Sequence, residues 1–132
     1  MEKLDQFAVL GGRILLALIF VAGGVGKLMD GGVSTIPYME AGGVPGFLFW
    51  PTALFELFAG LAIMAGYRTK LVALILAGFC LVTALLFHTD FSQAMQMPLF
   101  MKNLSMAGGF LILMRFGAGE FSMDNKGTPS EV

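Results

Sequence analysis

The stretch that decides the fold is FLFWPTALFELFAGLAIMAG, from Phe47 to Gly66. Its length matches the roughly 20 apolar residues that a helix needs to cross a bilayer. It holds one charged side chain, Glu56, near its centre. A charge at that depth costs about 2.5 kcal/mol or more unless a partner compensates it. The fold and function of the chain therefore depend on which residues lie around Glu56.

The composition places the whole chain in a membrane. Of its 132 residues, 57% are hydrophobic and only 13% are charged, and the mean hydropathy is +0.82. These values lie far outside the range of soluble domains. The net charge of −1 and the lack of a basic cluster exclude a nucleic-acid-binding surface. The single cysteine, Cys80, excludes a CxxC redox pair, and the single histidine, His88, excludes a haem with two axial histidines, so we expect no metal site.

Four apolar runs follow one another, each near the length of a membrane-spanning helix; they cover residues 7–28, 47–66, 71–87 and 98–116. Length favours helices over strands, because four strands cannot close a membrane barrel of the usual size. We therefore predict an all-α fold, a bundle of four transmembrane helices. The first run also resembles the apolar part of a signal peptide, but acidic residues precede it, and we expect a retained helix.

The connectors predict the remaining organisation. In the first connector, Ser34 lies between two glycine-rich turns and is a candidate cap for a short interfacial helix between the first two spans. Basic residues, including Arg68 and Lys70 in the second connector, concentrate on one side, so the positive-inside rule places both termini in the cytoplasm. Residues 1–121 form the membrane domain, and residues 122–132 have the composition of a disordered polar cytoplasmic tail.

Polar side chains from three different runs fall at similar depths. With a rise of about 1.5 Å per residue, the distances from the cytoplasmic face are about 12 Å for Arg13, 16 Å for Glu56, 18 Å for Asn103 and 20 Å for Lys102. Lys27 and His88 fall near the outer face instead. Two interpretations stay open: an Arg13–Glu56 ion pair that only fastens two helices, or a ligand site whose surplus positive charge attracts negative or strongly accepting oxygens.

Several short pieces of the chain together form a recognisable pattern, one piece per helix. They are Gly12-Arg13-Ile14-Leu15-Leu16, Glu56…Ala59-Gly60-Leu61, Ala84…Phe87-His88 and Met101-Lys102-Asn103-Leu104. In this order they resemble the DoxX family of small inner-membrane proteins, over nearly the whole chain to about Phe121. The resemblance implies a bacterial inner-membrane location and a link to quinone-dependent oxidoreductases and to stress responses. It also implies recurring polar positions, here Arg13, Lys27, Glu56, Arg68, His88, Lys102 and Asn103.

We therefore hypothesise that the bundle interior binds a quinone or a related small aromatic molecule, in a component of an oxidoreductase. Glu56 and His88 would move protons, and the ligand would be held by Arg13, Lys27, Lys102 and Asn103. No intrinsic cofactor is evident, so electrons would come from a membrane quinone or from a redox partner protein, and whether the chain is itself an enzyme stays open. Two alternatives remain: a non-enzymatic membrane anchor or subunit whose buried charges are structural, and an exporter of small aromatic compounds. A homo-oligomer is compatible with each.

Overall fold

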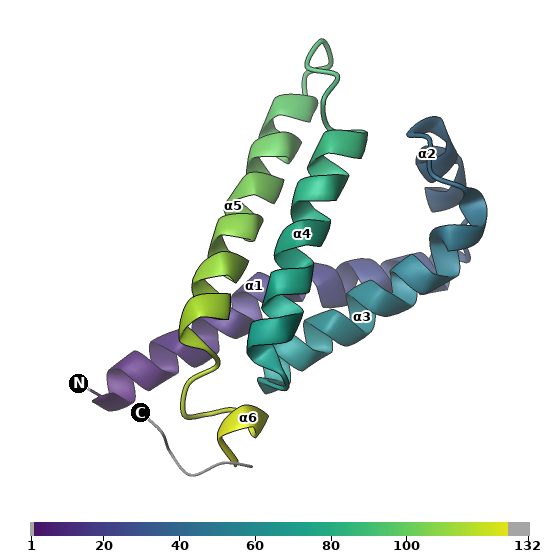
Figure 1. The fold of residues 1–132 in the computed structure, drawn as a ribbon. Coiled ribbons are helices and arrows are strands. Elements are labelled where there is room, and N and C mark those ends of the chain that lie inside the picture. The colour runs from purple at the N-terminus through teal and green to yellow at the C-terminus, as the bar shows by residue number, and fades with distance from the viewer. Residues whose placement is uncertain (1, 127–132) are drawn as a thin grey trace.

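The computed structural model describes residues 2–126 and consists of helices and connecting loops (Figure 1). Its four long helices are α1 (Glu2–Asp30), α3 (Phe49–Ala65), α4 (Thr69–Phe87) and α5 (Gln96–Phe116). Each, α3 together with the turn before it, is long and apolar enough to cross a membrane. The predicted all-α bundle of four membrane-spanning helices is thereby confirmed, and its orientation with both termini in the cytoplasm stays a prediction.

The four helices associate as two antiparallel pairs. Helix α1 lies along α3, helix α4 lies along α5, and the two pairs cross one another (Figure 1). The main hydrophobic core lies at this crossing. It takes side chains from all four long helices, among them Phe20 of α1, Ile63 of α3, Leu76 of α4 and Phe110 of α5. The helices within each pair contact one another more extensively than helices of different pairs do. The space between the two pairs can therefore hold a cavity.

Two glycines allow the close contact between α1 and α3. A Cβ atom added at Gly24 would lie 2.8 Å from the backbone nitrogen of Leu57, and one added at Gly60 would lie 2.8 Å from the Val21 side chain. Membrane helices associate through van der Waals packing rather than through the hydrophobic effect, so small residues at the contact are the means of bringing backbones together. These two glycines therefore set how closely α1 approaches α3.

Replacing Gly24 with alanine should destabilise the protein by about 1 to 3 kcal/mol, because the clash is with backbone that no side-chain rotation can relieve. Gly26 is the matched control: it lies on the same helix with nothing within 4 Å of an added Cβ, so Gly26→Ala should be neutral or slightly stabilising. Thermal unfolding in detergent measures both. Equal stability of the two variants would contradict the assigned contact.

A short helix follows α1, as the sequence predicts. Helix α2 (Thr35–Ala41) and a 3₁₀ turn, η1 (Gly46–Leu48), make up most of the connector to α3. The capping role predicted for Ser34 is wrong: its side chain makes no cap bond to α2, and its hydroxyl donates instead to Asp30 at 3.0 Å. Helix α2 reaches the other helix pair through Tyr38, whose ring stacks on Phe87 of α4 with centroids 5.2 Å apart.

The segment after α5 also differs from expectation. Residues 122–126 are not a disordered tail: Ser122 is buried, and residues Met123–Lys126 form helix α6. The carboxylate of Asp124 accepts hydrogen bonds from the backbone N–H groups of Arg68, at 2.7 Å, and of Thr69, at 2.9 Å. It thus caps α4, whose first N–H groups lack partners within the helix. The rest of the predicted tail, residues 127–132, lies outside the described residues.

Candidate functional site

The partner of Glu56 is Lys27. The Nζ atom of Lys27 lies 3.0 Å from both carboxylate oxygens of Glu56, in an ion pair between α1 and α3. The Glu56 side chain is 9% exposed and that of Lys27 is 27% exposed. Gly23, one turn before Lys27, makes room for the carboxylate, because a Cβ added there would lie 3.3 Å from its Oε1 atom. The pair therefore lies at the edge of the α1–α3 contact, with the lysine on its open side.

Arg13, the partner of Glu56 considered from the sequence, lies elsewhere. Its buried guanidinium donates to the carbonyl oxygen of Ile63, at 3.4 Å, and to that of Phe121, at 2.5 Å. Ile63 is seven residues beyond Glu56 on α3, which is about 10 Å along the helix axis. The Arg13–Glu56 ion pair considered from the sequence is therefore wrong. Arg13 joins the end of α3 to the C-terminal segment, close to the charge of Asp124.

The direction in which helical side chains lean explains the difference. Every Cα–Cβ bond tilts toward the N-terminus of its own helix. Since α1 and α3 run antiparallel, Arg13 and Glu56 lean in opposite directions along the bundle and move apart. Lys27 leans back toward the middle of α1, while Glu56 leans toward the start of α3, so these two side chains converge.

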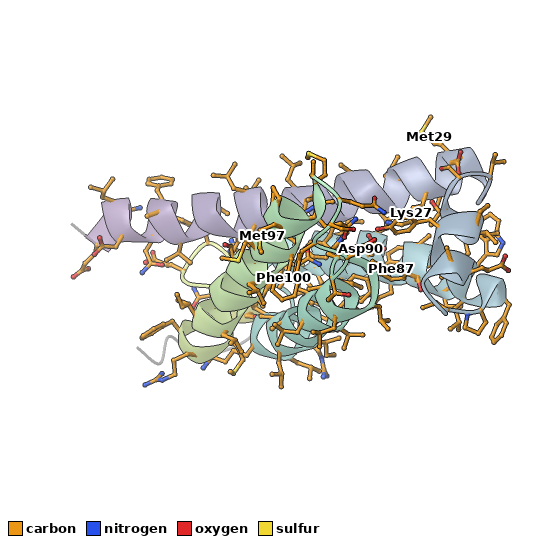
Figure 2. The ribbon with its side chains drawn as sticks, turned by 90° about the horizontal axis from the view of Figure 1, so that it is seen from above. Lys27, Met29, Phe87, Asp90, Met97 and Phe100 are labelled. Carbon is orange, nitrogen blue, oxygen red and sulfur yellow. The ribbon has the colours of Figure 1, made fainter. Side chains whose placement is uncertain are left out.

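The Lys27–Glu56 pair opens onto a cavity of about 380 Å³ between the two helix pairs. Figure 2 shows Lys27 on the side of α1 that faces Phe87, whereas Met29 projects away from the bundle. The cavity also receives three further polar residues predicted for a site: His88 at the end of α4, and Lys102 and Asn103 on α5. Five of the six predicted catalytic and ligand-binding residues therefore meet in one place, and the exception is Arg13.

These three residues differ in how their polar atoms are used. The amide nitrogen of Asn103 donates to the Cys80 carbonyl at 3.2 Å and to the Thr83 hydroxyl at 3.0 Å, so it ties α5 to α4. The Nδ1 atom of His88 is buried and has no hydrogen-bond partner within residues 2–126. Lys102 has no carboxylate within 4 Å among the described residues. His88 and Lys102 are thus the groups left to bind something else.

Aromatic and hydroxyl side chains complete the wall of the cavity, and little in the sequence singles them out. Phe20 of α1, Phe79 and Phe87 of α4, and Tyr38 of α2 supply the rings, and Thr52 and Thr83 supply the hydroxyls. Phenylalanine is frequent in this chain, with 13 copies, so position alone distinguishes these. A hydroxyl side chain inside an apolar run, as at Thr83, is the one feature of the sequence that indicates a residue of the cavity wall.

Arg68 and Lys70, expected to orient the protein in the membrane, lie at the opposite end from the cavity, in and after the turn between α3 and α4. Both side chains are exposed. Arg68 has a left-handed backbone, with φ at 47°, and its N–H group binds Asp124. Burial raises the pKa of the Asp124 carboxyl, but the hydrogen bonds from Thr69 and Arg68 and the charge of Arg13 outweigh it, so that the pKa lies below its usual value.

Comparison with known proteins assigns the chain to a family. The DoxX family model matches residues 8–89, and the SURF4 family model matches residues 52–128. The chain is 46% identical to the inner membrane protein YqjF of Escherichia coli K12, over 94% of this chain and 95% of that protein. It is 32% identical to the inner membrane protein YphA of the same organism, over 86% of each chain. No solved structure matches it. The chain therefore belongs to the DoxX family and is a multi-pass protein of the bacterial inner membrane.

Proposed function

We propose that this protein binds a quinone or a related small aromatic molecule in the cavity between its two helix pairs, as a component of a quinone-linked oxidoreductase. The observation that carries the proposal is the meeting of Lys27, Glu56, His88, Lys102 and Asn103 in one cavity. A volume of about 380 Å³ falls within the range of small-molecule sites, which combine apolar walls with a few polar groups.

The chemistry of the walls fits such a ligand. The rings of Phe20, Phe79 and Phe87 offer faces and edges against which a flat aromatic ring packs favourably. The ammonium groups of Lys27 and Lys102 would donate hydrogen bonds to the carbonyl oxygens of a bound quinone. Glu56 and His88 are the groups that would exchange protons with a ligand that is reduced or oxidised. Electrons would come from the ligand or from a partner protein.

A non-enzymatic membrane anchor is the second candidate, and two observations favour it. Asn103 uses its amide nitrogen to join α4 and α5, and Arg13 uses its guanidinium to hold backbone carbonyls. Both residues act structurally whether or not a ligand is present. The anchor interpretation, however, gives no role to the Nδ1 atom of His88 or to Lys102, neither of which has a partner among residues 2–126.

A blocking substitution tests the location of the ligand. Ile19 and Leu18 are neighbouring exposed residues of α1, 43% and 51% exposed, and of these two Ile19 lines the cavity. The protein in nanodiscs should bind ubiquinone-1 or menadione saturably in equilibrium dialysis, after subtraction of empty nanodiscs. Ile19→Trp should weaken binding at least about 10-fold, which is a loss of about 1.4 kcal/mol, whereas Leu18→Trp should leave it unchanged.

Two results would contradict the proposal. Absence of saturable binding by the wild-type protein would favour the anchor interpretation. Equal binding by the two tryptophan variants would show that the ligand lies somewhere other than in this cavity.

A further inference from the structure

The charges that line the cavity do not cancel. Its lysines and its carboxylate are Lys27, Glu56 and Lys102. Lys27 lies 3.0 Å from both oxygens of Glu56, so these two residues neutralise one another. Among the described residues, the carboxylate of Glu56 makes no salt bridge with Lys102. One positive charge is therefore left over.

Lys102 carries that charge. It lies on α5 six residues after the first residue of the helix, about 9 Å into the span. Within residues 2–126 no carboxylate lies within 4 Å of it. Lys102, Glu56 and the buried Cys80 all line the same cavity. The Lys102 side chain is exposed and lines the cavity. An ionisable residue within a membrane-spanning segment is by default a candidate functional position.

His88 adds a second unused group. Its Nδ1 atom is buried without a hydrogen-bond partner in the described part of the chain, although buried polar atoms are almost always bonded. His88 lies at the end of α4 and lines the same cavity as Lys102. An Nδ1–H group there can donate to an oxygen atom of a ligand, in addition to the donors of the Lys102 ammonium group.

We infer that the cavity selects an aromatic ligand that carries a negative charge on a ring oxygen, such as the anion of a hydroxyquinone, over the neutral quinone of the same shape. The inference rests on the proposed function and narrows it. The phenyl rings of the walls favour an aromatic body, and Lys102 supplies the counter-charge to the anionic oxygen, with His88 as a further donor. A neutral quinone leaves the charge of Lys102 uncompensated.

A matched pair of probes tests this. The 2-hydroxy-1,4-naphthoquinone molecule is an anion at neutral pH, and 2-methoxy-1,4-naphthoquinone has the same ring system but cannot ionise. In phosphatidylcholine nanodiscs, corrected with empty discs, the wild-type protein should bind the hydroxy compound at least about 10-fold more tightly. Charged hydrogen bonds of the usual strength are sufficient for a ratio of this size.

Variants assign the preference to Lys102. Lys102→Met should reduce the ratio to about 1, and Lys102→Arg, which keeps the charge, should retain most of it. Lys70→Met removes an exposed lysine at the far end of the bundle and should leave the ratio unchanged. A preference that survives Lys102→Met would overturn the assignment.

The outcomes separate this inference from the proposed function. If neither probe binds, the proposed function fails. If both probes bind the wild-type protein equally, the cavity is an aromatic site without selection for charge, and the inference alone fails. Displacement of the hydroxy compound by added phosphatidylglycerol would identify the cavity as a site for a lipid phosphate, which would also overturn it.

Discussion

Replacing Lys27 with methionine should lower the free energy of unfolding by about 3 to 4 kcal/mol, the largest effect expected of a single substitution in this protein. Methionine keeps the length and most of the packing of lysine but leaves Glu56 buried without its partner, and breaking a buried ion pair in this way is strongly destabilising.

Cys80 provides the measurement. It is the only cysteine of the chain and is 1% exposed, so the rate at which a maleimide modifies it reports unfolding in detergent. Lys70→Met, at an exposed position, is the control and should change the rate little. A loss below about 1 kcal/mol for Lys27→Met would show that the ion pair is not maintained in the folded protein.

The double variant Lys27→Met with Glu56→Leu distinguishes a structural pair from a wall of a binding site. Replacing both partners of a buried ion pair with apolar residues is often neutral or stabilising, so folding should recover. Binding of a quinone in the cavity should not recover if Glu56 and Lys27 contact the ligand. A folded double variant with wild-type affinity would assign the pair a purely structural role.

The second large effect is expected for Arg13→Met, which should weaken attachment of the C-terminal segment by about 2 to 4 kcal/mol. Arg13 is 1% exposed and donates to the carbonyls of Ile63 and Phe121, and hydrogen bonds from charged groups contribute about 1.5 to 3 kcal/mol each. Its charge also favours the ionised form of Asp124, which caps α4. Loss of Arg13 therefore removes the hydrogen bond to Phe121 and also weakens the capping of α4 by Asp124.

Hydrogen exchange measures this attachment. The backbone N–H groups of Arg68 and Thr69, which donate to Asp124, should exchange faster in Arg13→Met by a factor that matches the lost free energy. Arg115→Met, an exposed basic residue at the end of α5, is the control and should leave these amides protected. Unchanged exchange in Arg13→Met would contradict the role assigned to Arg13. Ligand binding in the cavity should be unaffected, since Arg13 does not line it.

The candidate site was only partly predictable from the sequence, and Arg13 shows why. An estimate from the rise per residue places Cα atoms along the membrane normal, but a long side chain displaces its charge by several ångströms along the helix. Arg13 and Glu56 have backbone positions at similar depth, and their side chains lean apart. The same estimate places Lys27 near the outer face, but its side chain leans back to meet Glu56.

The C-terminal segment shows a second limit. Composition describes residues 122–126 as polar and poor in apolar groups, which is typical of a disordered tail. Their structure depends on groups that other segments leave unsatisfied: the free N–H groups at the start of α4 and the carbonyl of Gly66. A short polar segment can be ordered by such bonds, and its own sequence does not reveal the partners.

By itself, the sequence determined that this protein is an all-helical membrane protein with four spans and a short helix between the first two, because length and apolar content decide which segments enter a bilayer. It also determined that Glu56 needs a partner. Only the tertiary structure decided that the partner is Lys27, that Arg13 holds the C-terminal segment, and that Lys102 lines the same cavity without an ion-pair partner in the described part of the chain. The physical reason is that pairing depends on helix direction, side-chain lean and close contact at Gly24 and Gly60, and these are properties of two helices together.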